Sequence, residues 1–189
     1  MMKLVLVCLF LTTYIYAEEI KVDREAITKA HNDLRAKYKS PPLKYSVSLE
    51  NTARTWAKKL QKDGCGMVHS HGKVGKTGEN LYWASPRIMI RTDSTGKKTR
   101  SRSLQKVKDE AVVQAWYDEV EWYDYDTNSC EKGQMCGHYT QVIWNTTSEV
   151  GCAAMACDDR SQVWVCEYTK PGNVSMHYAD GKVEKLKPY

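Results

Sequence analysis

Cysteine is the residue type that most constrains how this chain can fold. Of its seven cysteines, Cys8 lies in an apolar stretch at the start and the other six lie between residues 65 and 166. The first 17 residues, MMKLVLVCLFLTTYIYA, combine an early lysine, an apolar core and a small residue at Ala17, which is the pattern of a secretory signal peptide. Cleavage after Ala17 would leave an even number of cysteines in an oxidising compartment, which predicts disulfides. Spacing alone leaves their pairing open.

The same segment predicts a secreted, extracellular protein. The alternative is an uncleaved membrane anchor, but the apolar stretch is shorter than the ~20 residues that a membrane-spanning helix needs. No later segment is apolar enough to span a membrane. Two sequons, at Asn145 and Asn173, agree with secretion and are candidate glycosylation sites.

Positive charge is concentrated in one segment. The formal net charge is +5, and residues 86–108 contain eight basic residues and a single acidic one, Asp93. No aromatic residue is interspersed among them, which argues against a nucleic-acid-binding surface. Two interpretations remain open: a solvated, mobile loop, or a contact for anionic lipid headgroups or an acidic partner.

The hydrophobic period changes along the chain. The first two thirds predict helices from a cap at Asp23 to about Tyr38, from a cap at Ser48 to Gly64, and over residues 107–120. The last third alternates apolar and polar residues, which predicts strands over 139–144, 150–157 and 162–168. Helices followed by sequential strands indicate an α+β fold with an antiparallel sheet.

Four motifs occur in order: HNDLR at residues 31–35, GENL at 78–81, GHYTQVIWNTT at 137–147 and CEYTKPGNV at 166–174. Together they resemble the HNxxR, GEN, GHYTQxxW and CxYxxxGN motifs of the CAP superfamily (SCP/TAPS), and GHYTQ alone is highly specific. The resemblance covers most of the chain from Asp23 to Val174. It predicts a signal peptide at 1–17, a CAP domain at 18–174 and a polar C-terminal extension at 175–189.

The sequence departs from the family pattern in three places. Glu167 stands where a polar amide or a basic residue is common, and Lys170 stands where proline is common. A long basic insertion follows Trp83. With this insertion the chain resembles the venom allergen-like proteins of parasitic flatworms more than plant pathogenesis-related or wasp venom members.

The resemblance implies a disulfide-stabilised, three-layer α-β-α sandwich around a three-stranded antiparallel sheet. It implies the pairs Cys65–Cys157, Cys130–Cys136 and Cys152–Cys166. Cys152 and Cys157 are an odd number of residues apart, so on one regular strand they would face opposite sides and need different partners. By the same resemblance, His31, Asn32 and Arg35 are structural residues that form hydrogen bonds within the fold.

The resemblance also implies a cavity tetrad of two histidines and two acidic residues, here His69, Glu79, Glu119 and His138. His69 is preferred to its neighbour His71 because its Val-His-Ser context matches the family. Two imidazoles beside carboxylates suit a divalent cation such as zinc, with the two histidines as ligands and the glutamates orienting them. The alternative is that the His–Glu pairs only hold the fold together.

We assign no catalytic residues and expect a protein that is not an enzyme and that requires no cofactor. No serine or cysteine nucleophile motif accompanies the tetrad, and the HExxH pattern of zinc hydrolases is absent from the sequence. A metal-dependent hydrolase is the less favoured alternative.

Members of the family bind sterols through an aromatic loop and fatty acids between two helices. The matching loop here runs from Trp122 to Gly133, and planar aromatic rings would give a sterol a flat apolar surface. The candidate sterol contacts are Tyr117, Trp122, Tyr123 and Tyr125. The alternative is that these rings pack on the body of the protein.

A fatty-acid groove would lie between the first and third predicted helices, and we assign no residues to it. The predicted function is extracellular binding of sterols and fatty acids, in lipid sequestration or export and in host interaction. The competing hypothesis is an immunomodulatory scaffold that binds a host protein partner and has no lipid function.

Overall fold

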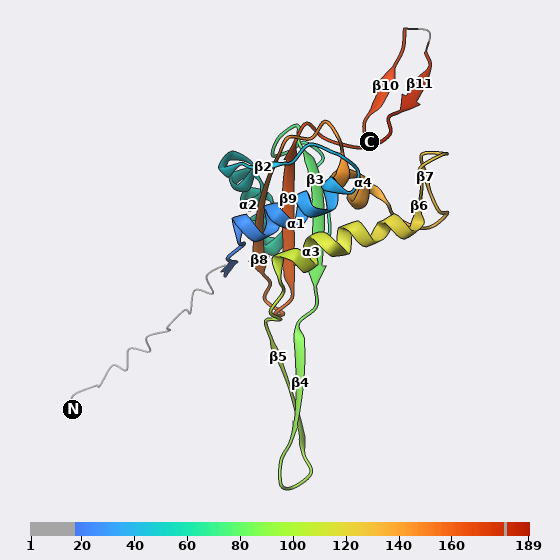
Figure 1. The fold of residues 1–189 in the computed structure, drawn as a ribbon. Coiled ribbons are helices and arrows are strands. Elements are labelled where there is room, and N and C mark those ends of the chain that lie inside the picture. The colour runs from blue at the N-terminus through green and yellow to red at the C-terminus, as the bar shows by residue number, and fades with distance from the viewer. Residues whose placement is uncertain (1–17, 180) are drawn as a thin grey trace, which may run out of the picture.

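The computed structural model describes residues 18–179 and 181–189 of the chain. The predicted signal peptide, residues 1–17, lies outside this part. None of the helices within it combines the length and apolar character needed to cross a membrane. Figure 1 shows a central sheet with helices on both sides and two hairpins that project away from it.

The centre of the sheet consists of three antiparallel strands in the order β8-β9-β3. These are β3 (Gly78–Ala84), β8 (Glu149–Ala156) and β9 (Gln162–Thr169). Two short strands pair with β8: β1 (Glu19–Ile20) is antiparallel and β2 (Lys44–Tyr45) is parallel. The predicted antiparallel core is confirmed, and the parallel β2 was not expected.

Helices cover both faces of this sheet and create two separate cores (Figure 1). Helix α2 (Val47–Lys62) packs on one face through residues such as Trp56 and Leu60. Helices α1 (Arg24–Ala36), α3 (Asp109–Tyr117) and α4 (Gly137–Ile143) contribute to the core on the other face. Strands β8 and β9 are almost entirely buried because both of their faces are covered. The α-β-α sandwich is therefore confirmed.

The predicted helix ends are partly right. Asp23 caps α1, since its carboxylate accepts hydrogen bonds from the backbone of Glu25 and Ala26. The start of α2 was predicted wrongly: the cap position is Ser46, and Ser48 lies inside the helix. Gly64 follows α2 with a φ of +89°, which glycine adopts easily.

The helix expected over 107–120 is shorter and continues as a tighter 3₁₀ turn. Helix α3 ends at Tyr117, and η1 follows it over Asp118–Trp122. Two short strands come next, β6 (Tyr123–Asp124) and β7 (Ser129–Cys130), which pair with each other.

The strand predicted over 139–144 is wrong, because these residues belong mainly to helix α4. Residues 139–144 are all buried, so their alternating polarity does not separate an inner face from an outer one. The end of α4 is held by another segment: Arg35 Nη1 donates to the carbonyls of Val142 and Trp144, each at 2.9 Å. Ser40 Oγ donates to the carbonyl of Ile143 at 2.8 Å. A helix of seven residues depends on such tertiary contacts.

Of the three structural residues expected in HNDLR, His31 and Arg35 are fully buried. The His31 ring lies 2.9 Å from the Tyr168 hydroxyl and 2.8 Å from the Ile27 carbonyl. Asn32 exchanges two hydrogen bonds with the backbone of Leu43. Burial lowers the pKa of His31 to about 4, so the ring is neutral at neutral pH.

The basic segment is a hairpin, not an irregular loop. Strands β4 (Arg87–Thr92) and β5 (Lys98–Ser103) pair along their full length and project from one end of the sheet (Figure 1). At the tip, Asp93 accepts hydrogen bonds from the backbone N–H groups of Thr95 and Lys97. A second hairpin, of β10 (Ser175–His177) and β11 (Val183–Lys185), forms the polar extension.

The three disulfides pair as the family resemblance implied. Cys65–Cys157 connects the segment after α2 to the end of β8, across 92 residues of sequence. Cys152–Cys166 joins directly opposed positions on β8 and β9. Cys130–Cys136 closes a short loop immediately before α4.

Candidate functional site

The four residues of the cavity tetrad come from four different elements. His69 lies in the loop after α2, Glu79 on β3, Glu119 in η1 and His138 in the first turn of α4. The ring centroids of His69 and His138 are 6.2 Å apart. His69, Glu79 and His138 line a cavity of about 270 Å³, and Glu119 lines a neighbouring apolar hollow of about 370 Å³ that His138 also reaches. The fold therefore brings the four residues into one region.

Each histidine is held by one glutamate. His138 Nδ1 lies 2.6 Å from Glu119, which also accepts hydrogen bonds from the backbone N–H of His138 and of Tyr139. His69 Nδ1 lies 2.6 Å from Glu79, which accepts a further bond from the backbone of Ser70. In the neutral imidazole, a carboxylate that accepts from Nδ1 holds the ring proton on that nitrogen. The other ring nitrogen, Nε2, then has a free lone pair. Within residues 18–179 and 181–189, neither Nε2 atom has a hydrogen-bond partner.

The two members of the His69–Glu79 pair shift each other toward their charged forms. The hydrogen bond to Glu79 raises the pKa of His69 above its ordinary value, although partial burial opposes this. Burial alone would raise the pKa of Glu79, but the hydrogen bonds from His69 and Ser70 outweigh it and lower that pKa. The pair is thus an electrostatically stabilised contact at the mouth of the cavity, where the His69 side chain is 45% exposed.

A third acidic residue, Glu167, adjoins the tetrad, and the sequence motifs did not predict this position. It lies on β9 directly opposite Glu79 on β3 and is completely buried. One carboxylate oxygen accepts a hydrogen bond from Thr77, and the other has no hydrogen-bond partner in the described part of the chain. Burial raises the pKa of Glu167 to about 7; the Thr77 hydrogen bond opposes this shift and the charge of Glu79 adds to it. The unusual residue at 167 was visible in the sequence, but only the strand register places it beside Glu79.

The donor set of the tetrad suits a metal only weakly. No cluster of three or more His, Cys, Asp or Glu side chains that could hold a metal ion occurs in the described residues. The two unpartnered Nε2 atoms offer two protein ligands, whereas zinc sites in proteins have three or four. These residues fit a divalent cation that water also coordinates, and they do not form a complete structural zinc site.

The four candidate sterol contacts are all partly buried. Tyr117 and Tyr123 both pack against the ring of Tyr139. The Tyr117 hydroxyl lies 3.0 Å from the Tyr38 hydroxyl on α1. The Tyr123 ring lies 5.5 Å from the ring of Tyr139. Residues 117–125, which we call the aromatic segment, are therefore continuous with tyrosines of the core. Part of the surface of this segment is already used for packing.

Tyr189 covers part of this segment, which the sequence did not reveal. Its ring stacks on Tyr125 with centroids 4.5 Å apart and planes inclined by 16°. The Tyr125 hydroxyl donates to the Tyr189 carbonyl at 2.7 Å, and the Tyr189 ring also lies 4.6 Å from Tyr38. Of the four expected contacts, Tyr125 thus packs directly against Tyr189.

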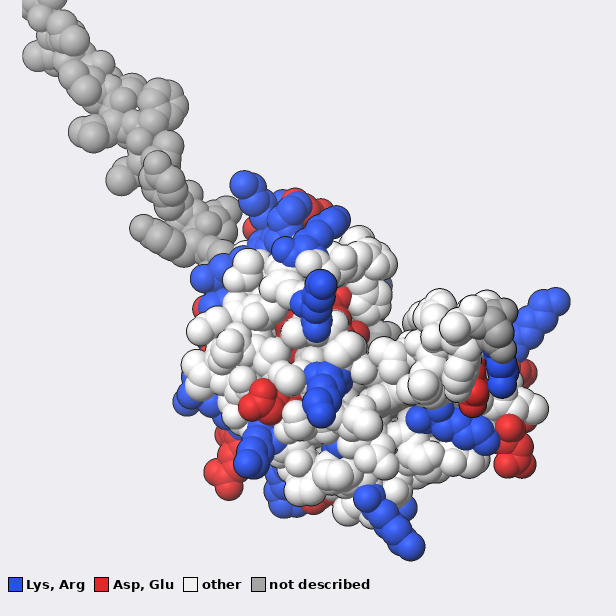
Figure 2. Space-filling view, turned by 90° about the horizontal axis from the view of Figure 1, so that it is seen from above, with Lys and Arg blue, Asp and Glu red and all other residues white. Residues whose placement is uncertain are grey.

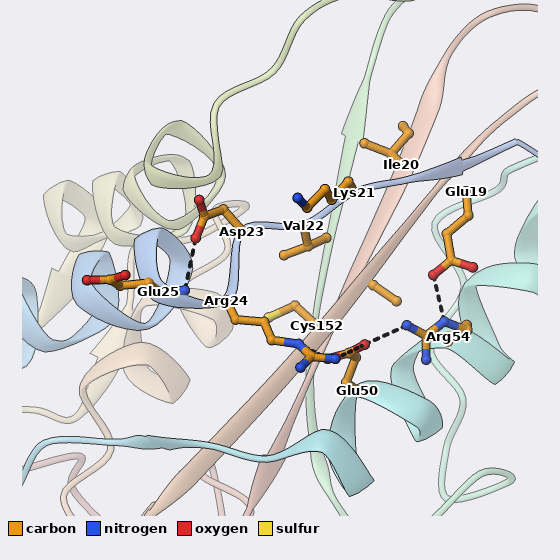
Figure 3. Close-up of a pocket in the computed structure, with 11 residues that line it drawn as sticks. Glu19, Ile20, Lys21, Val22, Asp23, Arg24, Glu25, Glu50, Arg54 and Cys152 are labelled. Carbon is orange, nitrogen blue, oxygen red and sulfur yellow. Dashed lines mark hydrogen bonds and ion pairs between the residues drawn. The ribbon is translucent and has the colours of Figure 1, made fainter.

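A hollow of about 340 Å³ lies between α1 and α3, where the fatty-acid groove was expected. Its wall on α1 includes two alanines, Leu34 and the ion pair of Lys29 with Asp33, and its wall on α3 includes Glu110 and Gln114. A second hollow, of about 480 Å³, lies between the segment 19–25 and α2 (Figure 3).

In this second hollow the charged groups satisfy one another. Glu50 is paired with Arg24 at 2.7 Å and with Arg54 at 2.5 Å (Figure 3). It also accepts a hydrogen bond from Tyr45. Burial opposes ionisation of Glu50, but the bonds from both arginines and Tyr45 outweigh it and lower its pKa to about 2. This network fastens the segment 19–25 to α2, and we assign no ligand to it.

The two candidate glycosylation sites differ in their surroundings. Asn145 is exposed, and among the described residues it forms a hydrogen bond only through its backbone N–H. The Asn173 amide accepts from Thr140 Oγ1 and donates to the Gly137 carbonyl. Asn145 is therefore the better placed of the two for a glycan, and both remain predictions.

The family assignment rests on a match to most of the chain. The family model described as "CAP: Cysteine-rich secretory protein family" matches residues 28–168. The chain belongs to the CAP family. Among curated proteins, this CAP protein is 33% identical over 188 residues to pathogenesis-related protein 1A1 of Solanum lycopersicum, covering 97% of this chain and 92% of the relative. It is 38% identical over 145 residues to pathogenesis-related protein 1B of Nicotiana tabacum, covering 77% of this chain and 73% of the relative.

Solved structures confirm the CAP fold. Venom allergen-like protein 4 of Schistosoma mansoni has a TM-score of 0.57 and 24% identity, covering 82% of this chain and 92% of that one. The crystal structure of NaASP2 with Zn²⁺ has a TM-score of 0.56 and 25% identity, covering 87% of this chain and 86% of that one. The expected likeness to venom allergen-like proteins is thus confirmed by structure, while the relatives named above are plant proteins.

Proposed function

We propose that this CAP protein is secreted, carries out no catalysis, and binds sterols and fatty acids outside the cell. The observation that supports sterol binding is the run of half-buried aromatic residues from Tyr117 to Tyr125. The β6–β7 pairing and the Cys130–Cys136 disulfide hold the far end of this segment, which reduces the entropy lost when a ligand orders it. Flat rings with polar tips suit a flat apolar ligand that has one hydroxyl.

The hollow between α1 and α3 supports a separate fatty-acid site. Its volume of about 340 Å³ lies at the lower end of the range of about 300–1,000 Å³ that is common for small-ligand pockets. Small side chains at Ala26 and Ala30 leave room for an acyl chain. The Lys29 ammonium, which is paired with Asp33, would bind the carboxylate of the ligand by exchanging this partner.

Saturable binding of radiolabelled cholesterol to the purified, oxidised protein tests the sterol proposal. Unlabelled sterol should compete fully, and a fatty acid should compete little because its site is separate. Trp122→Ala and Tyr125→Ala should each weaken binding at least tenfold. Trp83→Ala removes an exposed tryptophan on β3, outside the segment, and should leave binding unchanged. Unchanged affinity in both segment variants would reject the proposed site.

We also propose that the tetrad binds zinc weakly, through the Nε2 atoms of His69 and His138. The two unpartnered imidazole nitrogens support this, and one of the similar solved structures is that of NaASP2 with Zn²⁺. Calorimetric titration with zinc should give one weak site that His69→Ala or His138→Ala abolishes. His71→Ala is the matched control, since His71 adjoins His69 but lines neither hollow. An identical titration for all three variants would show that the His–Glu pairs only support the fold.

A further inference from the structure

The β4–β5 hairpin separates its residues onto two faces. In an antiparallel pair, directly opposed residues lie on the same face. Ile88 is opposite Arg102, Ile90 is opposite Arg100, and Thr92 is opposite Lys98. These six residues, which we call the Ile/Arg face, carry two aliphatic side chains on one strand and three cations on the other.

The Ile/Arg face is exposed to solvent along its whole length. Ile88 is 45% exposed and Ile90 is 65% exposed, and the basic partners opposite them are also exposed. Nothing in the described part of the chain forms a salt bridge within 4 Å with these three cations. Arg102, at the base, interacts electrostatically with Asp159, whereas Lys98 and Arg100 lie further out along the hairpin.

Charge on the face opposite to the hairpin tip is arranged differently. Figure 2 views the molecule from the side opposite to the hairpin tip and shows acidic and basic side chains interspersed. The hairpin contains a single carboxylate, Asp93, which the backbone of the tip binds. A projecting, almost purely cationic element with aliphatic side chains on the same face is therefore a local feature.

We propose that the Ile/Arg face docks on the surface of an anionic lipid bilayer. Basic residues near such a surface are attracted to the lipid phosphates, and exposed isoleucines gain free energy when they enter the acyl boundary. A sulfated polysaccharide would use the cations but would offer no apolar phase for Ile90. A second copy of the hairpin would bring three further cations against these three and would be repelled.

Docking by the hairpin leaves the lipid sites of the body outside the bilayer. The hairpin projects from one end of the sheet, whereas the aromatic segment follows α3 and the proposed fatty-acid hollow lies between α1 and α3 (Figure 1). The proposed contact does not depend on sterol binding, so it can be tested on vesicles without sterol.

Co-sedimentation with sterol-free vesicles tests the proposal. Wild-type protein should sediment with phosphatidylcholine vesicles that contain about 30% phosphatidylserine and not with pure phosphatidylcholine. Neutralising the cations with Lys98→Gln, Arg100→Gln and Arg102→Gln should weaken binding on the order of a hundredfold, at about 1 kcal/mol per residue. The double variant Ile88→Ser with Ile90→Ser should weaken it about tenfold or more at unchanged charge.

A matched control removes three exposed lysines elsewhere, by Lys44→Gln, Lys58→Gln and Lys62→Gln. It changes the net charge by the same amount and should keep nearly full binding. Because the hairpin lies outside both hydrophobic cores, circular dichroism should show that all variants remain folded. Wild-type vesicle binding by the isoleucine variant would overturn the proposed entry of the isoleucines into the acyl boundary and would leave a purely electrostatic contact. Equal losses in the hairpin and control triple variants would also overturn it.

Discussion

Replacing Glu167 with glutamine should make the protein more stable at high pH and leave its stability almost unchanged at low pH. In the folded protein the pKa of Glu167 is raised from 4.5 to about 7, chiefly by burial. Between these two values the folded state binds more protons than the unfolded state, so wild-type stability falls as pH rises through this window. A glutamine at this position has no such proton to lose, and its amide can donate to the carboxylate of Glu79 opposite it.

The size of the effect follows from the same shift. The window covers about 2.5 pH units, and each unit corresponds to about 1.36 kcal/mol, so the wild type should lose about 3 kcal/mol relative to the variant. For a chain of this length, 1 kcal/mol corresponds to about 2–4 °C in Tm. Glu167→Gln should therefore raise Tm by about 6–12 °C at pH 8 and by little at pH 4.5.

Urea unfolding and thermal melts of both proteins, from pH 4.5 to pH 8 with a chelator present, provide the measurement. Other titrating groups are common to both proteins, so the difference between the two curves reports residue 167 together with its electrostatic coupling to Glu79 and His69. Glu131→Gln removes an exposed carboxylate and controls for the change in net charge. A stability difference that is the same at pH 4.5 and pH 8 would refute the reasoning.

Four further perturbations test other parts of the structure. Replacing both Cys65 and Cys157 with serine should lower the free energy of unfolding by about 4–5 kcal/mol in urea, because the bond closes a 92-residue loop; a loss below about 1 kcal/mol would contradict this. Arg35→Lys should cost about 3 kcal/mol or more in the same assay, since one ammonium cannot serve four carbonyls; an unchanged midpoint would show that these bonds matter little. Gly151→Ala should cost about 3 kcal/mol, because its Cβ would lie 2.2 Å from a backbone nitrogen of α2; an unchanged melting curve would show that α2 shifts freely. Tyr189→Ala should strengthen cholesterol binding by uncovering the aromatic segment, and weaker binding would instead make Tyr189 part of the site.

Elements with strong local signals could be predicted from the sequence. The Asp23 cap, the Gly64 stop and the strands β8 and β9 follow from side-chain chemistry within a few residues. The family resemblance supplied the disulfide pairing and the four tetrad positions. The cap, the stop and the two strands agree with the structure because local preference and the global fold point to the same conformation. The three disulfide pairs also agree with it, whereas the tetrad as a binding site stays a prediction.

The failures come from long-range contacts. In the segment 139–144, Thr140 and Gln141 look like an outer polar face, yet both are buried and bonded to residues more than 30 positions later in the chain. Thr140 Oγ1 donates to the Asn173 side chain, and Gln141 accepts from the backbone N–H of Gly172. The sequence did not predict the β4–β5 hairpin, because charged residues occur on both of its faces and its strands lack a regular alternation of apolar and polar residues. The pairing of each histidine with its own glutamate, and the position of Glu167, depend on strand register and loop geometry that one sequence does not encode locally.

The capping of α4 by Arg35 and Ser40 has a consequence for how the protein opens. One end of α4 carries His138, and the other end is closed by a segment more than 100 residues earlier in the chain. When α1 loses its contacts, α4 loses its end caps, so the two helices should open as one cooperative unit. Backbone amides of both helices should then exchange with deuterium at the same free energy. A substitution at residue 35 would therefore loosen His138 at a distance, even though the two side chains share no contact.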